Sequence, residues 1–217
     1  MPPAEAVVGE IRRLPVLLAS ASPRRRELLA RAGVVFELGP VPVDEDLVGF
    51  ADPAGAAVEL AKRKALAAAR ARLEREPAAR IVVLAADTVV ALARAGTWEL
   101  LGKPDDASEA AHMLRALGGT RHQVVTGVCT VRCPDLALAC NCERTWVSMR
   151  AIAAGEVEAY VASGEWRDKA GGYAIQESAD RFVTALEEGG FDNVVGLPVA
   201  LALRLLDEVE RAAPQGR

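Results

Sequence analysis

A cluster of arginines at the predicted start of a helix is the first feature of this sequence that suggests chemistry. An apolar run, 14–19, leads into "SASPRRR", in which Ser22 suits the N-cap and Pro23 the first helical turn. The arginines 24–26 then occupy the positive end of the helix dipole, where acidic residues are usually favoured. With its free N–H groups, such a helix start is suited to bind phosphate, whose oxygens match the arginine guanidinium. The predicted polyphosphate cradle comprises Ser20, Ser22, Arg24 and Arg25. The alternative is a solvated, charged helix start.

A single carboxylate interrupts a long apolar run further along the chain. The run "IVVLAADTVV" begins at Ile81 and carries Asp87 at its centre. A carboxylate in a buried strand is destabilising unless it is paired or bound to a metal ion. Asp87 is therefore a candidate catalytic or metal-binding residue. The alternative is that it caps a turn beside Thr88.

Two shorter motifs supply further charges. The stretch "VDED", 43–46, follows a predicted strand, and its oxygens could hold Mg²⁺, although acidic loops are usually only solvated. The stretch "GKP" places Lys103 soon after another predicted strand. Loop glycines and prolines are common, so this motif is weak on its own.

The stretch "DKAGGYAIQ", 168–176, combines a charged pair, two glycines and a polar end. Glycine permits close approach of the backbone to a ligand, and the Gln176 amide can donate to and accept from the edge of a base. The alternative is an ordinary turn entering a strand. Taken together, these motifs are the parts required for metal-assisted chemistry on a nucleotide polyphosphate.

The elements that must position these residues alternate between strands and helices, which predicts an α/β domain. Strands are expected at 16–19, 34–38, 81–92, 97–101, 172–175 and 181–186, with two long strands between 122 and 150. Helices are expected at 23–32, 53–76, 106–117, 155–163 and 198–212. The residues 94–97 suit a hairpin turn. We expect one two-lobed folding unit around a central cleft.

The composition excludes several classes of protein. The chain has 217 residues, a net charge of −4 and 4% aromatic residues, which argues against a nucleic-acid-binding protein. It contains no run of about 18 apolar residues, so no membrane span is expected. The residues 1–13 lack the long apolar core of a signal peptide and are expected to form a short, disordered extension. A cytoplasmic location is the default expectation.

Four cysteines lie within 14 residues of one another, at positions 129, 133, 140 and 142. Their spacing, C-x3-C-x6-C-x-C, does not match the usual zinc patterns. Most of them fall in predicted strands, so buried thiols are the favoured interpretation. A metal or redox site is the alternative.

The motifs together resemble those of the Maf-type nucleoside triphosphate pyrophosphatases. The matching pieces, in chain order, are "LASASPRRRELL", "VDED", "AKRKA", "AADTVV", "LGKP", "HQVVTGV", "DKAGGYAIQ" and "VVGLP". They span nearly the whole chain, which predicts a Maf-like domain over 14–213. The resemblance implies an elongated mixed sheet flanked by helices, as in inosine-triphosphate pyrophosphatases. It also implies hydrolysis of the α–β phosphoanhydride with a divalent cation, Mg²⁺ or Mn²⁺, and a homodimer.

The resemblance also assigns roles to individual residues. Asp87 matches the family's catalytic aspartate, which orients or deprotonates the attacking water, and Glu45 matches an acidic residue that shares the metal with it. The positions that match cationic or polar substrate contacts are Arg24, Arg25, Lys64, Lys103 and Lys169, with Ser20 and Ser22 at the helix start. The positions linked to substrate choice are Arg24, Thr88 and Gln176.

The intact "DKAGGYAIQ" is similar to the branch of the family that prefers dTTP and UTP. The chain departs from that branch at Glu177, where a glycine usually follows the Ile-Gln pair, so reaction type is better supported than base preference. A non-catalytic nucleotide-binding module tied to cell division is the rival hypothesis. Carboxylates beside a polyanion favour the enzyme, because they repel phosphate unless a metal intervenes.

Overall fold

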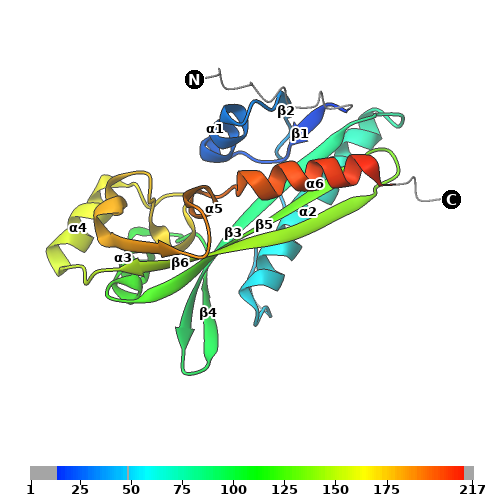
Figure 1. Cartoon of the computed structure of the whole chain (residues 1–217). Coiled ribbons are helices and arrows are strands. Elements are labelled where there is room, and N and C mark those ends of the chain that lie inside the picture. The colour runs from blue at the N-terminus through cyan, green and yellow to red at the C-terminus, as the bar shows by residue number, and fades with distance from the viewer. Residues whose placement is uncertain (1–13, 48, 213–217) are drawn as a thin grey trace, which may run out of the picture.

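The computed structural model describes residues 14–47 and 49–212, and within them seven strands form one mixed sheet (Figure 1). The strands are β1 (Val16–Leu18), β2 (Phe36–Leu38), β3 (Val82–Arg94), β4 (Thr97–Leu101), β5 (Arg121–Arg132), β6 (Leu138–Met149) and β7 (Val183–Glu187). They lie in the order β2-β1-β3-β5-β6-β7, and β4 pairs with β3. The pairs β1–β2 and β1–β3 are parallel and the other pairs are antiparallel.

The helices of the described residues lie along both faces of this sheet. They are α1 (Pro23–Arg31), α2 (Pro53–Arg75), α3 (Ala107–Leu117), α4 (Ala154–Ser163), α5 (Phe191–Val195) and α6 (Val199–Arg211), with short 3₁₀ segments η1 (Ala170–Gly172) and η2 (Ser178–Phe182). Aspartate N-caps start two of the helices: Asp52 accepts from the amide of Gly55 at 2.8 Å and Asp106 from that of Glu109 at 2.8 Å.

Strand β3 has two different neighbours along one of its edges. Its residues 82–84 pair in parallel with β1, and its residues 90–94 pair antiparallel with β4. The intervening residues, 85–89, pair with β5 on the other edge but with no strand of the described chain on this one. The sheet edge is therefore open between β1 and β4, as at the strand ends where ligands bind in open α/β sheets.

Alternation along β3 sends neighbouring side chains to opposite faces of the sheet. Val83 and Ala85 pack on the face covered by α2, with the helical alanines Ala61 and Ala65. Leu84 packs on the other face with residues of α1 and α6. The approach of α2 is close, because a Cβ on Gly127 of β5 would lie 2.1 Å from a backbone oxygen of α2. Glycine is therefore required at that position.

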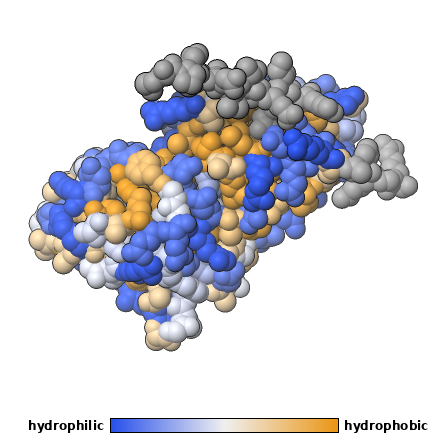
Figure 2. All heavy atoms as spheres, in the orientation of Figure 1, coloured by the Kyte–Doolittle hydropathy of each residue, from blue (hydrophilic) through white to orange (hydrophobic). Residues whose placement is uncertain are grey.

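The other half of the sheet carries a second lobe. There α3, α4 and η2 pack on the ends of β4, β5 and β6, around a core that includes Leu114, Val147, Tyr160 and Phe182. The helices of the two lobes lie toward opposite ends of the long strands (Figure 1). Hydrophilic residues cover most of the face shown in Figure 2, with apolar residues reaching the surface along its middle. The expected α/β fold with a mixed, helix-flanked sheet is confirmed.

Most predicted elements are present, with ends that shift by one or two residues. The expected helices all form, as do the hairpin at 94–97 and the two long strands between 121 and 149. The strand predicted at 172–175 is wrong. Gly171 and Gly172 adopt positive φ values of 69° and 68°, which ends any extended backbone there, and the segment becomes η1 followed by a turn. Helix α5 was not predicted. The extension predicted at 1–13 lies outside the described residues.

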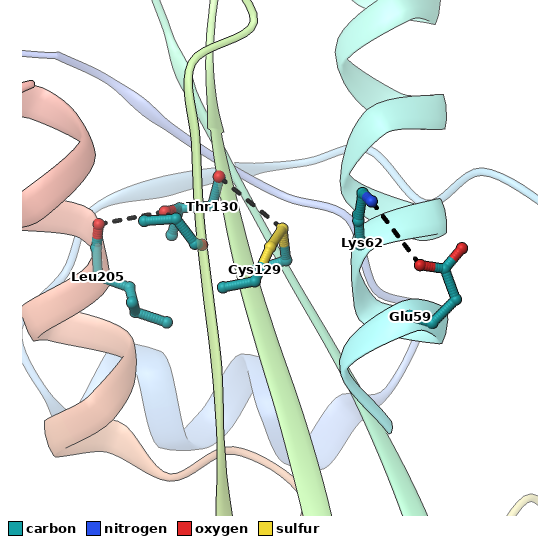
Figure 3. The surroundings of a disulfide bond; sticks show 7 residues. Glu59, Lys62, Cys129, Thr130 and Leu205 are labelled. Atoms are coloured by element: carbon teal, nitrogen blue, oxygen red, sulfur yellow. Dashed lines mark hydrogen bonds and ion pairs between the residues drawn. A yellow bond between two sulfur atoms is a disulfide. The ribbon is translucent and has the colours of Figure 1, made fainter. Parts of the chain in front are cut away.

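The cysteines divide into one disulfide and two free thiols. Cys129 of β5 and Cys140 of β6 are cross-strand neighbours and form a disulfide, so the prediction of buried thiols is wrong for this pair. Figure 3 shows its surroundings, where Thr130 faces α6 and donates to the carbonyl of Leu205 at 3.1 Å. Cys133 is a buried free thiol and Cys142 a half-buried one. Within 14–47 and 49–212, no three His, Cys, Asp or Glu residues are grouped to hold a metal ion.

None of the helices in the described part of the chain has the length and apolar character needed to cross a membrane.

Candidate active site

The start of α1 has the capped geometry that its sequence predicts. Ser22 is the N-cap with extended backbone, its Oγ accepts from the amide of Arg25 at 3.5 Å, and Pro23 opens the helix. Ser20, at the end of β1, is buried, and its Oγ accepts from the amide of Ser22 at 3.2 Å. The turn between β1 and α1 is therefore fixed by its own serines. The start of α1, Ser22 to Arg25, lines the cavity of the site.

The Arg25 side chain reaches back across this opening and bonds to two other segments. Its Nε donates to the carbonyl of Gly196 at 2.7 Å, and its Nη2 donates to Thr88 Oγ1 at 3.0 Å. Burial lowers the pKa of the Arg25 guanidinium, and the nearby Asp87 carboxylate opposes that effect. Gly196 has a φ of 121°, so a side chain there would strain the backbone that supplies this carbonyl. Arg25 is thus held firmly in place.

Arg24 extends in a different direction from Arg25. Its Nη2 donates to the backbone carbonyl of Asp168 at 3.2 Å. Asp168 precedes η1 and belongs to the second lobe, so this bond joins the start of α1 to the opposite wall of the site. The predicted cradle is therefore contacted from both lobes.

Asp87 and Thr88 lie on the stretch of β3 that pairs only with β5, and they point to opposite faces of the sheet. Asp87 is 6% exposed and forms an ion pair with Lys64 of α2. Thr88 lies on the other face, where its Oγ1 is 3.0 Å from Oγ1 of Thr126, its cross-strand neighbour on β5. Two adjacent residues thus connect the site to α2 on one face and to Arg25 on the other.

The acids and lysines form one charged cluster. The buried Lys64 Nζ contacts both the Asp87 carboxylate and Oε1 of Glu45, the latter at 2.7 Å. Lys103, after β4, lies 2.6 Å from Oε2 of Glu45. Burial alone would raise the pKa of Glu45, but hydrogen bonds from Lys103 and Lys64 outweigh it and lower the pKa to about 2. Glu45 is therefore ionised at neutral pH, and two carboxylates share a single buried ammonium group.

The second lobe supplies Lys169 and Gln176 from the segment around η1. Lys169 Nζ lies 3.5 Å from Oε2 of Glu177, and Gln176 Nε2 donates to Oε1 of the same glutamate at 3.1 Å. Both side chains also line the cavity between the lobes.

That cavity has a volume of about 740 Å³, within the range of small-molecule sites. The structure brings together in its walls every residue that the sequence analysis selected for the site. These are Ser20, Ser22, Arg24, Arg25, Glu45, Lys64, Asp87, Thr88, Lys103, Lys169 and Gln176. The expected central cleft is therefore present, and its charged residues come from both lobes.

A family model described as Maf-like protein matches residues 15–209, which is most of the chain. The chain belongs to this family. Three bacterial relatives that bear the name dTTP/UTP pyrophosphatase are similar over nearly their full lengths. The protein of Salinibacter ruber is 46% identical over 192 residues, which cover 88% of this chain and 89% of the relative. The protein of Deinococcus radiodurans is 47% identical over 191 residues, which cover 88% of this chain and 91% of the relative. The protein of Sphingopyxis alaskensis is 45% identical over 195 residues, which cover 89% of this chain and 96% of the relative.

Tyr173 of this Maf-family site was not selected by the sequence analysis, nor were the buried polar residues outside the cavity lining that support it. Tyr173 lines the cavity and is nearly buried, and its hydroxyl lies 3.0 Å from Nε2 of the buried His122. Burial lowers the pKa of His122 to about 4, so its ring is neutral at pH 7. Asn193 of α5 supports Thr126, whose hydroxyl donates to the Asn193 carbonyl at 2.8 Å. Tyr173 lies within "DKAGGYAIQ", and His122 and Thr126 lie within "HQVVTGV", whereas Asn193 lies in none of the quoted motifs.

The donor set is compatible with a divalent cation. Mg²⁺ usually keeps several waters and uses one or two protein carboxylates together with substrate phosphates. Glu45 and Asp87 both line the cavity and both contact Lys64, so their oxygens converge on one place. Two carboxylates in a cavity that is also lined by arginines and lysines fit a Mg²⁺ or Mn²⁺ ion whose coordination a phosphate group would complete.

Proposed function

We propose that this chain hydrolyses the α–β phosphoanhydride bond of dTTP and UTP to release a nucleoside monophosphate and pyrophosphate. One observation carries the proposal: a buried carboxylate, Asp87, lines a cavity whose walls also hold arginines and lysines from both lobes. This arrangement suits a polyanion that is attacked by water. The names of the similar bacterial proteins supply the substrate class.

The triphosphate would lie across the start of α1. The free N–H groups of the first turn and the guanidinium of Arg24 can bind its oxygens, while Arg25 adds positive charge from its fixed position. Lys103 can exchange part of its contact with Glu45 for a phosphate oxygen, since it is half-exposed. Cations so placed stabilise the charge that develops on the leaving pyrophosphate.

Asp87 is the proposed general base. Its carboxylate can accept a hydrogen bond from the attacking water and take up its proton as the bond to phosphorus forms. Lys64 holds that carboxylate in position through their ion pair. A divalent cation held by Glu45 and Asp87 would supply neutralisation of phosphate charge and a lower pKa for water at the site.

The base of the nucleotide would lie against the second lobe. Gln176 offers both an acceptor and donors, and a uracil or thymine edge offers carbonyl oxygens and one N–H. Thr88 and Arg24, together with Gln176, are proposed to govern substrate choice. Lys169 is proposed to contact the substrate. The homodimer and the domain limits 14–213 stay predictions of the family resemblance, and the cytoplasmic location stays the default expectation from the sequence.

A substrate panel tests this proposal. Purified protein is incubated with dTTP, UTP, CTP, dATP or dGTP in the presence of Mg²⁺ or Mn²⁺, and pyrophosphate and monophosphate are quantified. We expect kcat/KM for dTTP and UTP to exceed that for the purines by at least about tenfold, equivalent to ~1.4 kcal/mol. Release of orthophosphate with a nucleoside diphosphate would contradict the assigned bond. Binding of dTTP without turnover would favour the non-catalytic module.

A further inference from the structure

The residue that follows Gln176 has a contact that bears on base recognition. Gln176 Nε2 donates to Glu177 Oε1 at 3.1 Å. Among the described residues, no side chain or backbone group donates to Gln176 Oε1. Gln176 lines the cavity, whereas Glu177 is not among the lining residues. The carboxamide is thus bonded at its nitrogen and available at its oxygen.

Glu177 itself is held from two directions. Its second oxygen lies 3.5 Å from Nζ of Lys169, whose side chain is only 10% exposed. Its backbone amide donates to the Ala174 carbonyl at 3.1 Å, and the next residue, Ser178, donates through both its amide and its hydroxyl to Oε2 of Glu165, at 3.0 and 2.6 Å. The turn that carries Gln176 and Glu177 is therefore fixed on both sides.

A carboxamide can face a ligand in either of two directions, related by a 180° rotation that exchanges its oxygen and nitrogen. An ionised carboxylate accepts hydrogen bonds only. It therefore stabilises the direction in which the amide nitrogen faces it and opposes the reverse, in which two oxygens would meet. We propose that Glu177 is a specificity-determining positioning residue that fixes the Gln176 carboxamide so that it accepts a hydrogen bond from the base.

This direction discriminates between the two pyrimidine bases. Uracil and thymine carry a donor, N3–H, flanked by carbonyl oxygens, so Oε1 can accept from N3–H while the second amide hydrogen donates to a neighbouring carbonyl. Cytosine in the same position presents a lone pair at N3 and an amino group at C4, so acceptor would face acceptor and donor would face donor. A site of this kind rejects the wrong base because polar groups are left unpaired. The inference rests on the proposed pyrimidine substrates.

The test is the replacement of Glu177 by glutamine. The new carboxamide has nearly the same shape as the carboxylate but can either accept or donate, so it no longer favours one direction of the Gln176 amide. We expect the ratio of kcat/KM for UTP to that for CTP to fall at least about fivefold in E177Q and in E177A, with wild-type preference for UTP. In a Q176A background, E177Q should leave the ratio unchanged. Glu158, an exposed carboxylate on α4, supplies the control E158A, which should keep the wild-type ratio.

The UTP-to-CTP ratio separates this role from loss of the Lys169 ion pair, because a weaker ion pair changes all nucleotides together and cancels in the ratio. The same comparison is made on dissociation constants, by calorimetry with the α,β-methylene analogues of UTP and CTP, which need no turnover. A wild-type protein that binds the UTP analogue selectively, loses that selectivity in E177Q, and releases no pyrophosphate would uphold this inference and overturn the proposed function. An unchanged binding ratio in E177Q, or a wild type that does not distinguish the two analogues, would overturn the inference.

Discussion

Lys64 of α2 places one ammonium group against two carboxylates, Asp87 on β3 and Glu45 on the segment after β2, with 2.7 Å between its Nζ and Glu45 Oε1. The proposed base and the second proposed metal ligand are thus linked through one buried cation. Three separate segments of the chain meet at the Lys64 ammonium group, and the side chain that each contributes can be replaced on its own.

Replacement of Asp87 by asparagine should abolish turnover. The amide neither accepts a proton at neutral pH nor binds a divalent cation well, and general-base catalysis contributes about 10²–10⁴-fold in typical enzymes. We therefore expect kcat to fall by at least about 100-fold for dTTP, measured as pyrophosphate release. Circular dichroism and thermal unfolding of D87N should show a folded protein. Turnover close to wild type in the folded variant would show that the base lies elsewhere.

Replacement of Lys64 by methionine should make the protein more responsive to divalent cations. Without the ammonium group, Asp87 and Glu45 lose their shared counter-ion and repel each other across a partly buried site. K64M should unfold at a lower temperature than wild type at pH 7, and millimolar Mg²⁺ should raise its Tm more than it raises that of wild type. Lys62 is partly exposed on the same helix, and K62M serves as the control. An equal response to Mg²⁺ in both variants would argue against a metal at these carboxylates.

The ionisation of Glu45 predicts a pH-dependent contribution to stability. Its folded pKa of about 2 lies below the ordinary value of 4.5, so the ionised form is favoured by folding. The contribution is therefore complete above the unfolded pKa and is lost as the pH falls through the folded one, between about pH 5 and pH 2. The difference in unfolding free energy between wild type and E45Q, from urea titrations, should be constant above pH 5 and shrink below it. A difference that grows as the pH falls would contradict the assigned pairing with Lys64 and Lys103.

Arg25 should be important for stability as well as for activity. The arginines repel one another and lie at the positive end of the helix dipole. From the sequence alone, the substrate-free protein is therefore predicted to keep its thermal stability when Arg25 is replaced by alanine. The structure indicates otherwise, because Arg25 bonds to Gly196 and Thr88. Hydrogen bonds of a charged donor contribute about 1.5–3 kcal/mol each, so R25A should be destabilised by a few kcal/mol and should also lose activity.

Arg26 provides a matched control for Arg25. It lies in the same helical turn but is exposed, so R26A should keep both the Tm and the kcat/KM of the wild type. Thermal unfolding and dTTP hydrolysis are measured on both variants. An R25A protein that unfolds early yet keeps full activity would limit Arg25 to a structural role, with the phosphate bound by other groups.

Replacement of Gln176 by alanine should weaken base preference more than it slows the best substrate. When a bound base covers the Gln176 amide, a base with the wrong hydrogen-bonding groups leaves polar atoms unpaired, and this penalty disappears with the side chain. Across the same nucleotide panel, Q176A should lose most of the preference for dTTP and UTP over dATP and dGTP. A variant with full pyrimidine preference would show that another residue reads the base.

The amino-acid sequence by itself determined the local features of this protein. Helix starts at Pro23, Pro53 and Ala107 follow from their serine or aspartate caps, and the apolar run in 81–92 marks a buried strand, because these signals act between residues close in the chain. Asp87, Arg24 and Arg25 of the proposed site also stood out in the sequence, since a carboxylate within an apolar run and arginines at a helix start conflict with local preference. Such conflicts are expected at functional sites.

The tertiary structure decided how those residues are used. The sequence predicted Lys64 as a substrate contact through family resemblance, but only the packing of α2 on β3 pairs it with Asp87. The partners of Arg25 and the non-extended backbone at 172–175 depend on contacts between separate segments, such as the bond from the Ala174 amide to the Tyr160 hydroxyl at 3.1 Å. Contacts between distant segments produce no periodic pattern in the sequence. They depend on which surfaces pack against each other when the two lobes form around β3, β5 and β6.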